Sequence, residues 1–277
     1  MTYSNDEIIK KANNCLKKGI NPASAEVALG VAYFEKGSLE KALTHYLKAL
    51  EINEACAEAH AGLGMSYARL GKSDKVIMHL ETALKLSPDC GLIANWIADA
   101  YYDIGDLDKA ISFYSEALKL DSADNNAQND MADAYRLKGD HKTALEMYDR
   151  ALAIDPGDTN ALLEKAQCLV QLKEPEKALI TLRELITNFP ESRDAAAAMV
   201  VCAAILGKLG RQNDAYMWFT KSLEFFPYNR MVLFQAAICA YRLNKLHDGI
   251  GFVQRILQMN PSDERAKSLL KKLNSKK

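Results

Sequence analysis

The sequence repeats with a period of 34 residues, and this period constrains the fold more than any other feature. Residues 125–158 show the pattern. Their first half places three residues at the spacing of one helix face, namely Met131, Ala132 and Tyr135. Their second half places four residues on another helical stripe, namely Ala144, Tyr148, Ala151 and Leu152. Gly139 and Asp140 lie between the halves, where a turn needs a left-handed residue and an N-cap, and Pro156 ends the second helix. We therefore predict a helix, a turn and a second helix.

Seven copies of this pattern follow one another. They occupy residues 23–56, 57–90, 91–124, 125–158, 159–192, 196–229 and 230–263. The eighth residue of each copy is small, namely Gly30, Gly64, Ala98, Ala132, Ala166, Ala203 and Ala237. The twenty-fourth is bulky and apolar, namely Tyr46, Leu80, Tyr114, Tyr148, Leu182, Phe219 and Val253. Small residues let helices approach closely, so we expect tight packing within each pair.

The seven copies resemble the tetratricopeptide repeat. The resemblance implies an all-α fold, a right-handed superhelical solenoid of antiparallel helix pairs, with fifteen or sixteen helices and no strand. Each unit of a solenoid buries its apolar stripe against its neighbours, so one elongated core without an internal domain boundary is expected.

The ends and one insertion depart from the period. Residues 1–22 are predicted to hold an N-terminal capping helix with Asn5 or Asp6 as its N-cap and Gly19 at its end. Residues 264–277 are predicted to form a C-terminal capping helix with a basic tail. Before the sixth unit the spacing lengthens by three residues, which predicts a longer first helix there and a hinge or a change of curvature.

The charge of the chain is nearly balanced overall but uneven along its length. The net charge of −1 argues against a nucleic-acid binder. Residues 91–158 hold fourteen acidic against six basic residues, whereas residues 230–277 hold three acidic against ten basic residues. No apolar run of membrane-spanning length and no apolar signal core is present, so we expect a cytoplasmic protein without membrane insertion. The six cysteines are scattered and are expected to be reduced thiols.

The sequence holds no motif for catalysis. It has no HExxH, no phosphate-binding glycine loop and no Gly-x-Ser-x-Gly elbow. His45 and His79 share position 23 of adjacent units and could be neighbours, but two histidines do not complete a metal site. We expect no enzyme, no metal and no cofactor.

Function is therefore expected from a surface. In the tetratricopeptide repeat family the first helices line an inner, concave wall, chiefly through positions 2, 5, 9 and 12. The corresponding candidates for partner binding are Asn95, Asp99, Tyr102, Asn126, Asn129, Asp133, Arg136 and Gln167. The asparagines resemble the ladders by which some members grip extended peptides, and carboxylates favour basic side chains. The alternative is a merely solvated helix surface. Other parts of this wall are apolar, namely Val27, Val31, Ala61, Met65, Val200, Ala204, Phe234, Ile238 and Tyr241.

These features favour a non-catalytic scaffold that binds extended or helical segments of partner proteins, basic or neutral in charge, and assembles a complex. The alternative is a targeting or regulatory subunit of a separate enzyme. A chaperone adaptor is disfavoured, because Val27, Val31, Gly62, Leu92 and Trp96 stand where its carboxylate-binding residues would be. The basic C-terminal end could also bind the acidic units of a second copy, which would give a homo-oligomer.

Overall fold

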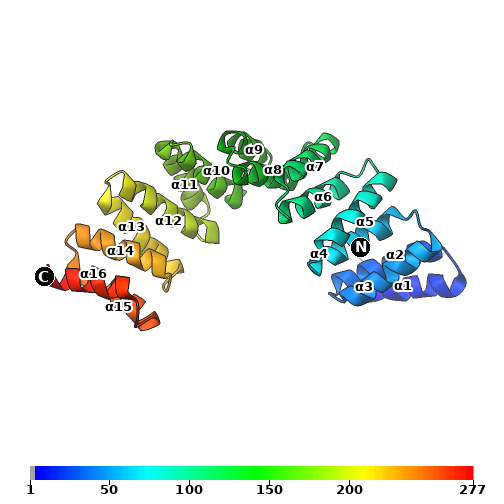
Figure 1. Cartoon of the computed structure of the whole chain (residues 1–277), viewed down its shortest axis with the longest axis horizontal. Helices are drawn as coiled ribbons and strands as arrows, with labels where there is room; N and C mark the ends of the chain where they lie inside the picture. The colour runs from blue at the N-terminus through cyan, green and yellow to red at the C-terminus, as the bar shows by residue number, and fades with distance from the viewer. Residues whose placement is uncertain (1–3, 277) are drawn as a thin grey trace. The chain divides into compact units, whose positions relative to one another are not determined.

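The structure, a computed structural model, describes residues 4–276, and this part of the chain contains helices and no strand. The first eight helices are α1 (Asn5–Lys18), α2 (Pro22–Glu35), α3 (Leu39–Ile52), α4 (Ala57–Arg69), α5 (Ser73–Leu86), α6 (Gly91–Asp103), α7 (Leu107–Leu120) and α8 (Asn125–Leu137). The next eight are α9 (His141–Ile154), α10 (Thr159–Gln171), α11 (Pro175–Asn188), α12 (Arg193–Lys208), α13 (Gln212–Phe225), α14 (Arg230–Arg242), α15 (Leu246–Met259) and α16 (Glu264–Ser275). The predicted all-α fold of helix pairs is confirmed (Figure 1). None of the described helices has the length and apolar character needed to span a bilayer.

The turn inside each helix pair contains one left-handed residue. Glycine fills it at Gly37, Gly71, Gly105, Gly139 and Gly210, but Lys173 (φ 62°) and Asn244 (φ 59°) adopt the same conformation. In the third pair the backbone N–H of Asp106 donates to the carbonyl of Tyr101 at 2.9 Å across this turn. That hydrogen bond satisfies a carbonyl at the end of α6, so the turn itself terminates the helix.

The chain divides into two compact units, Met1–Thr143 and Ala144–Lys277. In a solenoid each repeat packs only on its neighbours, so the sequence period does not show where such a division falls. The boundary lies within α9 and not at the three-residue insertion.

Tyr46 of α3 is the centre of packing at the start of the first unit. Its side chain is 2% exposed and packs in a cluster with Phe34, Ala42 and Leu63. A Cβ atom on Gly30 would lie 2.5 Å from the Tyr46 ring, and one on Gly62 would lie 2.3 Å from it. The expected close approach at the eighth position is thus found in the first pair, and α4 approaches the same ring.

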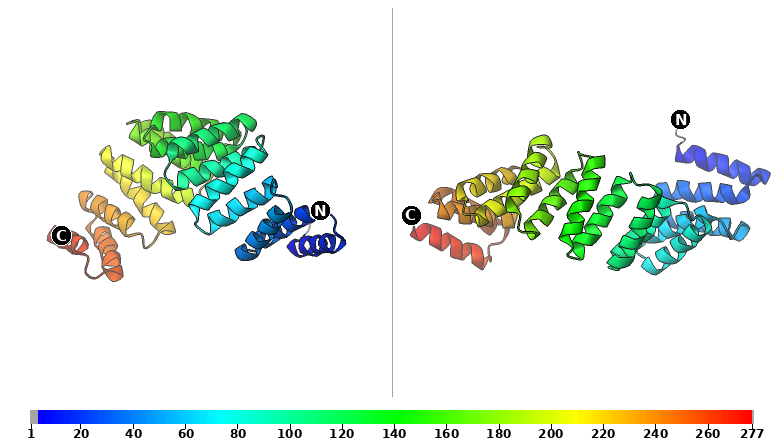
Figure 2. Two further views of the ribbon diagram at one scale, coloured as in Figure 1. Left: turned by 45° about the vertical axis from the view of Figure 1, so that its right-hand side comes forward. Right: turned by 90° about the horizontal axis from the view of Figure 1, so that it is seen from above.

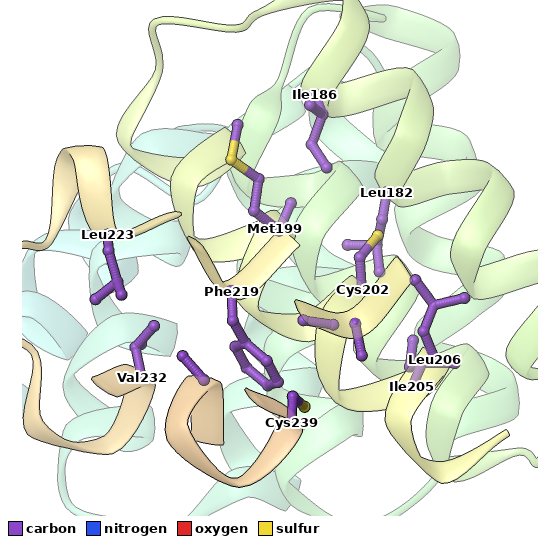
Figure 3. Packing of buried hydrophobic residues seen from close by; sticks show 14 of the residues in the cluster. Leu182, Ile186, Met199, Cys202, Ile205, Leu206, Phe219, Leu223, Val232 and Cys239 are labelled. Carbon is purple, nitrogen blue, oxygen red and sulfur yellow. The ribbon is translucent and has the colours of Figure 1, made fainter. Parts of the chain in front are cut away.

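The second unit has one large apolar core. Figure 3 shows Phe219 of α13 among side chains of α12 and α14, including Cys202, Val232 and Cys239. The predicted longer helix is confirmed, because α12 has 16 residues and Ser192 caps it by accepting from the N–H of Ala195. The further views of Figure 2 show the successive helices of this unit.

Helices α1 and α16 pack on the first and last helix pairs. Helix α1 starts after Ser4, whose side chain accepts from the N–H of Glu7, so the predicted caps Asn5 and Asp6 are wrong. Ser4 and Glu7 form a capping box that satisfies two backbone donors. At the other end, a Cβ on Gly249 would lie 2.8 Å from Leu273 of α16, which explains a glycine in that packing position.

Candidate binding groove on the first helices

Helices α6 and α8 carry most of the predicted binding residues, and the two helices are in contact. Asn95 and Asp99 lie one turn apart on α6, and Asn129 and Asp133 lie one turn apart on α8. Residues four apart share one face of a helix. We call the surface formed by α2, α4, α6 and α8 of the first unit the first-helix groove.

The two ladder asparagines are buried. Asn95 is 8% exposed and Asn129 is 9% exposed. Within the described residues, the buried Oδ1 atom of Asn95 accepts no hydrogen bond. A buried carbonyl oxygen without a donor carries a free-energy cost.

Carboxylates gather beside these amides. Asp99 is half-buried and accepts a hydrogen bond from the hydroxyl of Tyr114 at 2.7 Å. Burial raises the pKa of Asp99, and Asp103 and Asp124 raise it further, against the opposing effect of the Tyr114 hydrogen bond. Burial likewise raises the pKa of Asp130 to about 7, with further contributions from Asp99, Asp133 and Asp124. Negative charge is therefore concentrated where α6 and α8 meet.

The other predicted residues have mixed surroundings. Asp133 accepts from Arg136 through Nε at 3.0 Å and Nη2 at 2.8 Å, so this carboxylate is partly neutralised. Tyr102 is half-buried and Asn126 is exposed. Gln167 belongs to the second unit, where its amide donates to Glu164 at 2.7 Å.

Two residues of this cluster were not among the predicted site residues. Asp130 follows Asn129 directly, and its half-burial depends on tertiary packing that the repeat pattern does not give. Tyr114 was assigned only to the core stripe. The sequence does indicate a polar role for Tyr114. Position 24 is leucine in the preceding unit and tyrosine here, and a buried tyrosine hydroxyl needs a hydrogen-bond partner.

An apolar cavity opens in the same groove. It has a volume of about 580 Å³ and includes the predicted apolar wall residues Val27, Val31, Ala61 and Met65. Leu92 and Trp96 of α6 also line it. Leu92 is 54% exposed, so an apolar surface is open to solvent here.

The second unit has a cavity of its own, of about 440 Å³, lined in part by Val200, Ala204 and Ile238. Lys208 and Arg242 stand at this cavity. Phe234 and Tyr241 are instead partly buried against the core of the unit, and the ammonium of Lys276 lies 4.5 Å from the centroid of the Tyr241 ring.

The histidines have partners other than each other. Nδ1 of His45 lies 2.6 Å from Oε2 of Glu26, and Nδ1 of His79 lies 3.2 Å from Nδ1 of His60. The suggested pairing of His45 with His79 is therefore replaced by two separate pairs. Among residues 4–276, no group of three histidine, cysteine or acidic side chains is arranged to hold a metal ion, and no cysteine forms a disulfide.

Stacked antiparallel helix pairs with a left-handed residue in each turn define a helical repeat protein. Tetratricopeptide repeat family models match residues 30–71, 57–90, 89–157 and 135–202, which together span residues 30–202 without a gap. The chain belongs to the tetratricopeptide repeat family. No curated protein sequence matches it.

Solved structures of other tetratricopeptide repeat proteins are similar in fold. The C-terminal part of a repeat protein from Cytophaga hutchinsonii has a TM-score of 0.76 at 14% identity, covering 88% of this chain and 99% of that one. PilF from Pseudomonas aeruginosa has a TM-score of 0.62 at 18% identity, covering 74% and 92%. YrrB, described as having an unusual peptide-binding site, has a TM-score of 0.56 at 19% identity, covering 69% and 97%.

Proposed function

We propose that this protein is a non-catalytic scaffold that binds extended segments of partner proteins in the first-helix groove and so assembles a complex. The observation that carries the proposal is the cluster of half-buried carboxylates, Asp99 of α6 and Asp130 of α8, on two helices that are in contact. Charged groups held out of water without compensating charge cost stability. A ligand that brings positive charge to these carboxylates would recover part of that cost.

The chemistry of the groove favours a basic segment. Residues 91–143 of the first unit hold ten acidic against five basic residues, and opposite charge on a partner gives both attraction and selectivity. The description of YrrB as a peptide-binding member of the same family supports a peptide as the ligand.

Replacing Asp99 by asparagine tests this proposal. A library of random twelve-residue peptides is selected on the whole chain, and retained peptides are measured against the wild type, Asp99→Asn and the control Asp89→Asn. Asp89 is exposed, so its replacement makes the same change of charge outside the groove. We expect retained peptides to contain lysine or arginine and to bind Asp99→Asn roughly fivefold to tenfold more weakly, for the loss of one charged contact.

Salt is the second variable of the experiment. Attraction across a wet groove is screened with a Debye length of about 10 Å at 0.1 M salt, so affinity for the wild type should fall as salt rises. Equal binding to Asp99→Asn and the wild type at low salt would contradict the proposal. Retained peptides without basic residues would contradict it as well.

A further inference from the structure

The first-helix groove continues from the carboxylates into the apolar cavity. The cavity of about 580 Å³ and a second one of about 280 Å³ share two lining residues, Met65 of α4 and Trp96 of α6. The smaller cavity extends from these residues to Asp99 and Asp103. An apolar hollow and a pair of carboxylates are thus joined on one surface of the first unit.

The apolar cavity is built into the packing of three helix pairs. Its lining comes from α2, α4 and α6, and its floor includes Gly62, which cannot carry a side chain because the Tyr46 ring occupies that space. Ala57 and Ala61 line the cavity from α4, and their small side chains fill little of its volume. Val31 (44% exposed) and Leu92 (54% exposed) form part of its wall. Large apolar groups that face an open hollow are typical of a surface that a partner side chain covers.

The charge around the cavity selects among possible occupants. The charged residues that line it are Glu35 and Glu58, both acidic. The adjoining cavity adds Asp99 and Asp103 and one cation, Lys72. An acidic segment would place like charges together, which costs free energy, whereas a basic segment is attracted along the whole path.

We propose that this cavity receives a bulky aliphatic or aromatic side chain of the same partner segment whose lysine or arginine lies against Asp99. The groove then recognises two features together, an apolar anchor at Leu92 and Trp96 and a basic residue at Asp99. This inference rests on the proposed function and specifies the class of segment that the groove takes. Apolar anchors in pockets supply most of the binding free energy of many interfaces, and charges add selectivity.

Leu92→Glu tests the apolar part of the site separately from the acidic part. The matched control is Leu137→Glu, because Leu137 is a leucine of similar exposure (53%) on α8 that lines neither cavity. Far-UV circular dichroism and thermal unfolding check that both variants are folded. For a peptide retained on the wild type, we expect Leu92→Glu to lower affinity about tenfold or more, since a charge would enter an apolar contact, and Leu137→Glu to change it little.

A peptide variant and a local probe complete the design. The same peptide with its apolar anchor replaced by serine should bind the wild type and Leu92→Glu with similar affinity. In a Trp218→Phe background, Trp96 is the single tryptophan of the chain, and its emission should shift to shorter wavelength when the original peptide binds but not when the serine peptide binds. This readout requires no substitution in the cavity.

The outcomes separate the two proposals. Suppose that peptide affinity falls in Asp99→Asn but not in Leu92→Glu or on replacing the apolar anchor of the peptide by serine. That result would support the acidic site and show that the proposed apolar anchor is wrong. If neither substitution weakens binding, both proposals are wrong. Retained peptides that lack a bulky apolar residue, or no shift of Trp96 emission on binding, would also overturn the anchor.

Discussion

Tyr46→Ala is expected to lower the free energy of unfolding of the first unit by about 3–5 kcal/mol. The Tyr46 side chain is 2% exposed, and Gly30 and Gly62 have no side chains with which to fill the space that it would leave. Removing the ring therefore creates a cavity between α2, α3 and α4 that the surroundings cannot close. Urea unfolding followed by circular dichroism measures the loss.

The neighbouring Leu47 provides the control for this substitution. Leu47 lies on the same helix and is 45% exposed, so Leu47→Ala should change stability by less than about 1 kcal/mol. A loss of stability in Tyr46→Ala as small as that in Leu47→Ala would show that the ring does not hold the three helices together.

The sequence predicted part of this packing. A small residue at position 8 of each unit indicates close approach within a helix pair, and Gly30 does lie close to α3, but that the Tyr46 ring is its neighbour was not predicted. The contact with Gly62 crosses to the next unit and was not predicted from the repeat. Lys173 occupies the turn position that most other units fill with glycine, and the sequence alone did not show that it adopts the same left-handed conformation. The division into two units was not predictable, because it depends on how closely successive pairs pack.

Asp130→Asn is expected to stabilise the protein at pH 8 by about 1–2 kcal/mol, after allowance for the partial exposure of the group to solvent. Burial, together with Asp99, Asp133 and Asp124, raises the pKa of Asp130 to about 7. In the unfolded chain an aspartate has a pKa of about 3.9. Between these values the folded state binds more protons than the unfolded state, so the carboxyl lowers stability as pH rises from about 4 to about 7.

The pH dependence of this effect is the informative measurement. Urea unfolding of the wild type and Asp130→Asn should differ most at pH 8 and progressively less towards pH 4.5, where the carboxyl is increasingly protonated in the folded state. Asp89→Asn is the control, because Asp89 is exposed. A difference between Asp130→Asn and the wild type that does not grow with pH would show that the buried charge is not destabilising.

The binding site was less predictable than the fold. The positions of Asn95, Asp99, Asn129 and Asp133 on α6 and α8 follow from the repeat, but the burial of the two amides depends on the residues that surround them. The pairing of Asp133 with Arg136 leaves Asp99 and Asp130 as the main concentration of buried negative charge. Gln167, assigned by the same rule, lies in the second unit.

The central claim is that a basic partner segment binds in the first-helix groove. Carbodiimide coupling tests it most directly, because it joins a lysine amine to a carboxylate only where the two are in contact. A lysine-containing peptide retained on the whole chain is coupled at low salt, and the joined residues are identified by mass spectrometry. We expect the peptide lysine to be joined to Asp99, Asp103 or Asp130 of the first-helix groove. Coupling confined to carboxylates of α3, α5 or α7, or to the second unit, would contradict the assignment of the groove as the binding surface.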